Sequence, residues 1–540
     1  MNEGGICNGL ATLHAAYALK GEPGKFEKIL KFIADGIKEE GIENEDIDVF
    51  AIQVAATFEP EQYNLQLSQS NAVEMLSVNG YSLKSSYNLA LVTDNESWES
   101  VFKELALKNN EVLQVSNMNH AISIQKINNV YTVYDPNYSE GYKNFTSEKD
   151  LIKELHKNVF GYKTNQDMGL YLNVIRHPQD NAIRTFPEIT SIYDKFLLKE
   201  NAKATLSYAA LNNDGRIIDY LLNKGADDIE NAVALAVVNN NYHALPPLLS
   251  RLENDNERYS SILLALQCGR KEAFDVLMQN QDIKTLYNDI LGYKRNNVWH
   301  IKDITKAAKG GNPQLLKNCI EQRINYVTNL RISAEIKTMP ENIQEEACAL
   351  LKKDVTEQIS VAILALKDTP EDPLLNAVQS GSDETVKVLI EQLHKTGHQL
   401  DDADKIKYLQ AAISHNHLYV ASCLINEEPK ISSKLLNCLH MDTWAVERTN
   451  ITLLNLLKEK GMEFSSAAQK VIDYKNQKSL TFIDSLGIAV AKFTDFIKDN
   501  LFNRKAQGVT YEPRLFKQMK QSSQESKPQI TDDDLNTPKV

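Results

Sequence analysis

The sequence contains no apolar run of about eighteen residues, the shortest stretch that spans a bilayer, so it predicts no transmembrane helix. Its start lacks a basic segment followed by an apolar stretch, and we therefore expect no Sec-type signal peptide. Secretion by a route that does not use such a signal stays open.

Cysteine is scarce and shows no paired spacing. The chain has 6 cysteines in 540 residues, and none of them forms a Cys-x-x-Cys pair. This usage suits a reducing compartment rather than a disulfide scaffold, and it gives no zinc pattern. The sequence also lacks a P-loop and a Gly-x-Gly-x-x-Gly motif. We therefore expect neither a metal nor a cofactor.

Basic residues are outnumbered by acidic ones. Asp and Glu number 72 against 59 Lys and Arg, which gives a formal net charge of −13. Because phosphate binding needs a basic surface, this balance argues against nucleic acid as the main partner, although a locally basic surface stays open. A chain of 540 residues is too long for one core, and we expect about two to four domains.

Residues 1–178 combine helical patterns with strand patterns. The first half is mainly helical in its periodicity. Later runs at 111–116, 120–127 and 130–134 are rich in β-branched and aromatic residues, with asparagine-rich turns between them. These runs predict strands of an antiparallel sheet, and 168–175 predicts a closing strand.

Cys7 lies in a Gly-x-Cys-x-Gly-Leu segment at the start of the first predicted helix. In the first turn of a helix, unpaired N–H groups and the positive end of the helix dipole favour an anion, here a thiolate. Such a thiol can have a lowered pKa and act as a nucleophile. For a lone cysteine, a small buried core residue is the alternative.

A nucleophilic cysteine needs a base, and that base needs an orienting group. The alternation of apolar residues places His120 at the start of a strand. If residues 128–129 form the turn, Asp135 at the end of the next strand lies near His120. A structural histidine and a turn-capping Asp before Pro136 are the alternatives for each residue alone. The three residues together favour a catalytic triad.

Three segments resemble the motifs of a known family. They are the Gly-x-Cys-x-Gly-Leu opening, the His-Ala-Ile segment at His120 and the Tyr-Asp-Pro-Asn segment at Asp135. This family is the papain-like cysteine protease family of bacterial effectors, of the YopT and AvrPphB type. The resemblance covers roughly residues 1–178 and implies an α+β papain-like cysteine protease domain. It implies Cys7 as nucleophile, His120 as general base and Asp135 as orienting acid. It also implies Asn2 in the oxyanion hole, with the backbone N–H of Cys7 as second donor.

A second pattern covers residues 201–470. Pairs of small residues, each followed by a turn and by apolar doublets and triplets, start at residues 377, 411 and 445, which lie 34 apart. Units of this kind bury their apolar faces only by stacking. The pattern resembles ankyrin repeats, degenerate and without the Thr-Pro-Leu-His turn. We therefore expect an all-α ankyrin-like solenoid, and an α-solenoid of another repeat type is the alternative.

The remaining segments are expected to connect or extend these two parts. Residues 179–200 carry no strong pattern and predict a linker. Residues 471–505 predict a C-terminal helical cap. Residues 506–540 are rich in Gln, Ser, Lys and Asp, which predicts a disordered tail.

A protease-like domain joined to ankyrin-like repeats, with no Sec signal, resembles an ankyrin-repeat effector of an intracellular bacterium such as Legionella. This implies a monomeric virulence effector, secreted into the host cytoplasm, that cleaves a host protein bound by its repeats through a thioester acyl-enzyme. The same triad would also serve a deamidase, a transglutaminase or an acyltransferase. A catalytically dead protein-binding scaffold is the third alternative.

Overall fold

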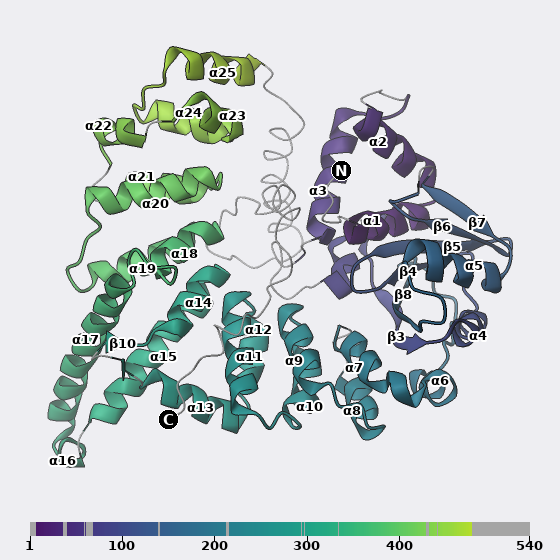
Figure 1. The fold of residues 1–540 in the computed structure, drawn as a ribbon, viewed down its shortest axis with the longest axis horizontal. Coiled ribbons are helices and arrows are strands. Elements are labelled where there is room, and N and C mark those ends of the chain that lie inside the picture. Colours follow the sequence, from purple (N-terminus) through teal and green to yellow (C-terminus); the bar gives the residue numbers. More distant parts are fainter. Residues whose placement is uncertain are drawn as a thin grey trace. The chain divides into compact units, whose positions relative to one another are not determined.

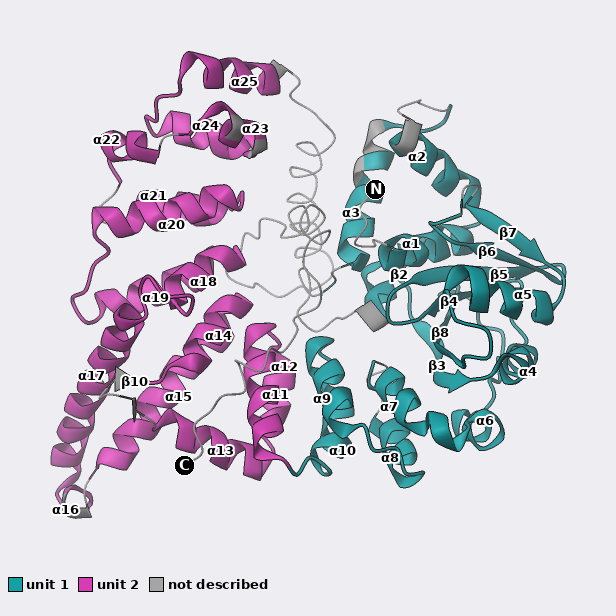
Figure 2. Cartoon of the chain, viewed as in Figure 1, with its two compact units in different colours: residues 1–253, 518–540 teal, residues 254–517 magenta. Residues whose placement is uncertain are grey.

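The computed structural model describes most of the chain up to residue 477. The described ranges are residues 7–35, 40–58, 60, 69–138, 141–211, 215–292, 294–295, 298–332, 334–427, 431–439 and 441–477. The chain divides into two compact units, residues 1–253 with 518–540 and residues 254–517 (Figure 2). The predicted tail and most of the predicted cap lie outside the described residues.

The first unit begins with helices around one central helix, α1 (Cys7–Lys20). It packs against α2 (Pro23–Asp35), α3 (Asn44–Phe58) and η2 (Gln69–Met75). Every residue of α1 from Gly9 to Ala18 is buried. A helix that is surrounded in this way belongs to the core rather than to the surface. The sequence predicted only one apolar face for it.

A six-stranded antiparallel sheet packs against α1, in the order β3-β8-β4-β5-β6-β7 (Figure 1). Two short strands, β1 (Ser77–Val78) and β2 (Tyr81–Ser82), form a separate pair. The main strands are β3 (Ser85–Thr93), β4 (Glu111–Ser116), β5 (Ala121–Ile127), β6 (Val130–Tyr134), β7 (Tyr142–Phe145) and β8 (Met168–Arg176). Helices α4 (Asn95–Leu105), α5 (Glu148–Glu154) and η3 (Leu155–Val159) lie between strands along the chain.

The hairpin of β5 and β6 has the predicted two-residue turn. Asn128 and Asn129 have positive φ angles of 51° and 64°. Asparagine tolerates this left-handed conformation, which a tight hairpin turn requires. The turn pairs Ile127 with Val130 and sets the register of both strands. Strands β4, β5, β6 and β8 fall within a residue of the predicted runs, whereas β3 and β7 were not predicted.

Further helices of the first unit follow the sheet. They are α6 (Ile189–Phe196), η4 (Lys199–Asn201), α7 (Ala202–Ala210), α8 (Gly215–Asn223), α9 (Ile229–Val238), η5 (Tyr242–Ala244) and α10 (Leu245–Leu249). Two of these helices, α6 and α7, hydrogen-bond through side chains to the backbone at the outer edge of β3. The Val92 N–H donates to Thr205 Oγ1 on α7 at 3.1 Å, and the Tyr193 hydroxyl on α6 donates to the Ala90 carbonyl at 2.8 Å.

The described part of the second unit is almost entirely helical. Its helices are α11 (Asp255–Gln267), α12 (Lys271–Leu277), α13 (Gln281–Leu291), α14 (Lys302–Gly310), α15 (Pro313–Arg331), α16 (Ala334–Lys337), α17 (Glu341–Ala365), α18 (Pro373–Ser380), α19 (Asp383–His394), α20 (Asp402–Ser414), α21 (Leu418–Asn426), α22 (Ser433–Leu436), η6 (Asn437–Leu439), α23 (Thr443–Arg448), α24 (Ile451–Glu459) and α25 (Ser466–Gln477). One pair of two-residue strands, β9 (Lys294–Arg295) and β10 (Val298–Trp299), precedes α14. No described helix is both long enough and apolar enough to cross a membrane.

The predicted fold class, an α+β papain-like domain followed by an ankyrin-like solenoid, is wrong. The described residues are mainly helical, a small six-stranded sheet is confined to the N-terminal part, and no clear ankyrin solenoid follows it. Repeats of one kind need units of one size. Here α18 has 8 residues, α15 has 19 and α17 has 25.

The small-residue pairs that suggested repeats have another physical cause. Ala307 and Ala308 are fully buried in α14, which packs against α11 and α18. In the same helix, a Cβ added at Gly310 would collide with the carbonyl oxygen of Leu266 on α11. Small residues recur because helices cross closely there, and any packed helical array has that need.

The contact between α1 and α3 generates a stability prediction. A Cβ at Gly9 would lie 2.5 Å from the Val54 carbonyl oxygen, so we expect Gly9→Ala to lower the free energy of unfolding by about 1–3 kcal/mol. Gly24, in α2, has no atom within 4 Å of an added Cβ. Gly24→Ala is the matched control and should be neutral or slightly stabilising. Equal urea midpoints for the two variants would contradict the close approach.

Candidate active site

Cys7 is the first residue of α1, a helix of 14 residues. The thiol therefore lies at a helix N-terminus, where free N–H groups and the helix dipole favour negative charge. Because α1 packs against β4 and β5, its first turn faces the end of the hairpin that those two strands form.

The loop of that hairpin is fixed by Asn117. Its Oδ1 accepts from the backbone N–H groups of Asn119 and His120, both at 2.8 Å. Its own N–H donates to the His120 carbonyl at 3.0 Å. Side-chain capping of this kind holds a short loop in one conformation. As a result, His120 is held directly before β5.

Asp135 follows β6, the strand paired with β5. Its Oδ1 lies 2.9 Å from His120 Nε2, and its side chain is 2% exposed. The same oxygen accepts from the Asn137 N–H at 2.8 Å. The Asn137 amide nitrogen also lies 3.4 Å from His120 Nε2. Since Nε2 faces the carboxylate, we infer that Nδ1 is the ring nitrogen available to the thiol.

The electrostatics of the site couple Cys7 to His120. Burial alone would raise the pKa of the Cys7 thiol. This pKa is nevertheless lowered overall. The causes are a hydrogen bond to His120, the charge of that ring and the backbone N–H groups of Ala121 and Asn8. Burial disfavours a charged His120, but Asp135 and Cys7 raise the pKa of His120 to about 9. Both shifts favour the thiolate–imidazolium form of the pair over its neutral form.

A polar cluster holds the first turn of α1 in place. Gln114 Nε2, on β4, donates to Asn8 Oδ1 and to Thr12 Oγ1, both at 2.9 Å. The Asn8 amide donates to the Thr57 carbonyl on α3 at 3.2 Å. The residue after the thiol is thus tied both to the sheet and to a second helix.

A second buried histidine on α1 has a different character. Burial lowers the pKa of His14 to about 3, so its ring is neutral near pH 7. Its Nδ1 lies 2.6 Å from Ser123 Oγ, and its ring stacks on Tyr134 with centroids 4.6 Å apart. His14 is therefore a core residue, which leaves His120 as the histidine beside the thiol.

The structure brings together three of the four predicted site residues: Cys7, His120 and Asp135. Asn2 lies outside the described residues, so its place in the oxyanion hole stays a prediction. Sequence reasoning missed Asn117 and Asn137. Each lies within three residues of a predicted triad member, but the sequence does not distinguish such an asparagine from an ordinary turn residue. In the described part of the chain, no group of three or more His, Cys, Asp or Glu could hold a metal ion.

Tyr208 on α7 reaches the loop that carries His120. Its hydroxyl accepts from the backbone N–H of Met118 and lies 3.3 Å from the Tyr162 hydroxyl. Its ring lies so close to Gly169 that an added Cβ there would be 2.6 Å away. Sequence reasoning missed this residue because nothing in the spacing connects it with His120.

The ion pair predicts how Cys7 reacts with iodoacetamide. We expect Cys7 alkylation to follow an apparent pKa below 9.0, because His120 stabilises the thiolate. In His120→Ala only burial and the backbone N–H groups remain, so alkylation at pH 7 should slow at least about tenfold, which corresponds to one pKa unit. Peptide mass spectrometry follows each cysteine separately. Cys423, whose pKa burial raises to about 12, is the internal control and should stay unmodified. Identical Cys7 titrations in both proteins would rule out the pair.

Tyr208→Phe tests the support of the loop. Loss of its hydroxyl removes the partner of the Met118 N–H, and we expect Cys7 alkylation at pH 7 to slow about two- to tenfold, the effect of one hydrogen bond. Thr205→Val removes a hydrogen bond from the same helix without touching the loop, so it should leave the Cys7 titration unchanged. If both variants behave alike, Tyr208 supports only the docking of α7.

No protein-family model matches the chain, and no curated protein is similar enough to match it. The assignment of this site therefore depends on its geometry and its electrostatics.

Proposed function

We propose that the chain is a thiol enzyme, a cysteine protease, in which Cys7, His120 and Asp135 form a catalytic triad. One observation carries this proposal. A thiol at a helix N-terminus is hydrogen-bonded to a histidine whose Nε2 lies 2.9 Å from a buried carboxylate. Nucleophile, base and orienting group thus lie in the order that thiol catalysis needs.

The reaction starts from the thiolate of Cys7. Its sulfur forms a bond to the carbonyl carbon of an amide, and the carbonyl electron pair moves to the oxygen. The predicted donors for this oxyanion are the Asn2 side chain and the Cys7 N–H. The His120 imidazolium then protonates the departing nitrogen as the C–N bond breaks, which leaves a thioester on Cys7 and a neutral imidazole.

Water completes the cycle. His120 takes a proton from a water molecule, and the oxygen of that water attacks the thioester carbon. The C–S bond then breaks, which regenerates the Cys7 thiolate and leaves His120 as the imidazolium. Asp135 stabilises the charged ring whenever it forms and holds its orientation. Its burial strengthens this interaction because little water screens the carboxylate.

The substrate we propose is a host protein. The motifs around the triad, which resemble those of bacterial effector proteases, support this choice, and the helical region after residue 201 supplies a large surface for recruitment. On this proposal the protein is a monomeric effector that acts in the host cytoplasm. A side-chain amide would give the same kind of thioester with release of ammonia, and water would then complete a deamidation. Attack by an amine or alcohol in place of water would give acyl transfer, so both reactions are alternatives within this chemistry.

The test is incubation of a host-cell extract with the wild-type chain and with Cys7→Ala. We expect new protein N-termini with the wild type and none with Cys7→Ala, as read by N-terminal peptide sequencing. Asp135→Asn should lower the rate by at least about a hundredfold, because the ring loses its orienting charge. Cys423→Ala, which changes a thiol outside the site, should cleave normally.

Other results would redirect the proposal. A mass gain of about one dalton on Gln or Asn would indicate deamidation, and a larger added mass would indicate acyl transfer. Equal products from wild type and Cys7→Ala would show that the triad is not catalytic.

A further inference from the structure

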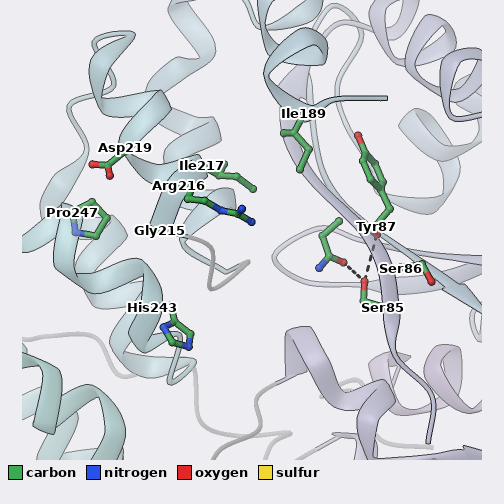
Figure 3. A pocket seen from close by; sticks show the side chains of 11 residues that line it. Ser85, Ser86, Tyr87, Ile189, Gly215, Arg216, Ile217, Asp219, His243 and Pro247 are labelled. Carbon is green, nitrogen blue, oxygen red and sulfur yellow. Dashed lines mark hydrogen bonds between the residues drawn. The ribbon is translucent and has the colours of Figure 1, made fainter. Parts of the chain in front are cut away.

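The first unit has a cavity of about 780 Å³ beside β3 (Figure 3). Its lining includes both Arg216 and Asp219. Because these two side chains carry opposite charges, the lining does not favour one class of ligand. An exposed face of α17, in the second unit, has a more selective chemistry.

Helix α17 is buried only in its second half. It packs against α15 and α19 (Figure 1). No residue from 341 to 354 is buried, and Val355 is the first residue of the helix that is. The first half is rich in Glu, Gln, Ala, Leu and Lys, which are strong helix formers. A helix of this length is nevertheless marginal in water without packing, so a docked partner would stabilise it.

Three large apolar side chains of α17 are exposed on one face. Ile343 is 41% exposed, Leu350 is 64% exposed and Val361 is 46% exposed. Because an α-helix has 3.6 residues per turn, these three positions fall within about 20° of one line along the helix. An apolar stripe of this kind normally faces a core or a partner.

Two carboxylates lie along the same line. Glu346 and Glu357 are exposed and fall within about 60° of it. Among the described residues, neither carboxylate has a hydrogen-bond or ion-pair partner. Lys353 lies between them on the same side and forms no ion pair with either, whereas Asp354 is bound by Arg331. This face therefore presents two free carboxylates against one ammonium group.

The carboxylates disfavour several kinds of partner. Nucleic acid and an anionic lipid surface would repel them. A two-fold pair of chains that overlaps along the whole face would set Glu346 of one copy beside Glu357 of the other, so that like charges meet. A helix that carries basic residues beside its apolar residues suits both the apolar line and the carboxylates.

We propose that the α17 stripe docks an amphipathic helix of a partner protein, which places a Lys or Arg opposite each glutamate. The α17 stripe consists of Ile343, Glu346, Leu350, Glu357 and Val361. Side chains of packed helices interdigitate, so the two basic residues of the partner should lie about eleven residues apart, like the glutamates. The apolar residues would give affinity, and the charges would give specificity. This surface offers a place for a recruited protein and does not depend on the triad.

The test uses the full chain with Cys7→Ala, so that binding is measured without turnover and independently of the proposed function. The probe is a phage-displayed library of amphipathic helices of about 20 residues, which is long enough to cover the α17 stripe. The selected sequences are then synthesised, and we expect a Lys or Arg at two positions about eleven residues apart. Leu350→Ala should raise their Kd at least about tenfold, because it removes the central apolar side chain.

Glu346→Lys and Glu345→Lys form a matched pair with the same change in net charge. Glu345 is also exposed, but it lies about 100° from Glu346 around the helix and outside the α17 stripe. Glu346→Lys should raise the Kd at least about threefold, whereas Glu345→Lys should leave it unchanged. A peptide whose facing Lys or Arg is replaced by Glu should bind Glu346→Lys more tightly than it binds the parent chain.

An unchanged far-ultraviolet circular dichroism spectrum would show that α17 stays helical in each variant. Failure to select any peptide, or equal Kd values for Glu346→Lys and Glu345→Lys, would overturn the proposal. A concentration-dependent dimer that Leu350→Ala abolishes would overturn it too, since the occupant would then be a second copy of the chain.

Discussion

The approach of α1 to α3 at Gly9 is the constraint on which the candidate site depends. It brings the start of α1 close enough for the Asn8 amide to reach the Thr57 carbonyl on α3. From the other side, Gln114 on β4 binds the same turn. Contacts from α3 and from β4 therefore hold the first turn of α1, where the Cys7 thiol lies. The hairpin that carries His120 is formed by β4 together with β5. Burial of α1 from Gly9 to Ala18 fixes the position of its first turn, where the Cys7 thiol meets His120.

Local chemistry made much of the site predictable. The asparagine pair at 128–129 sets the register of β5 and β6, and that register brings Asp135 beside His120. The periodicity after Cys7 located the start of its helix. Such features can be predicted from the sequence because they depend on local backbone geometry rather than on contacts between distant segments. Asn117 acts at short range too, yet the sequence does not distinguish a loop cap from an ordinary turn residue.

The remaining features depend on contacts between distant segments. Gln114 and Tyr208 support the site only because β4 and α7 pack where they do, and no spacing along the chain reports that packing. The prediction of an ankyrin-like solenoid was wrong for a related reason. Small pairs such as Ala307 and Ala308 mark close helix crossings, but the crossing alone does not set the length of each helix. Helices of 8, 9 and 13 residues, namely α18, α14 and α20, therefore share one local signature.

The reach of Tyr208 into the His120 loop also limits how this chain could be rearranged in evolution or by design. A fragment that ended with β8, the last strand of the sheet, would lose the Tyr208 hydroxyl beside the Met118 N–H. Recombination that exchanges the helical region would therefore have to bring its own tyrosine, facing a glycine at the position of Gly169. An exchange of helices that begins after α7 would therefore keep this contact, whereas one that replaces α7 would remove it.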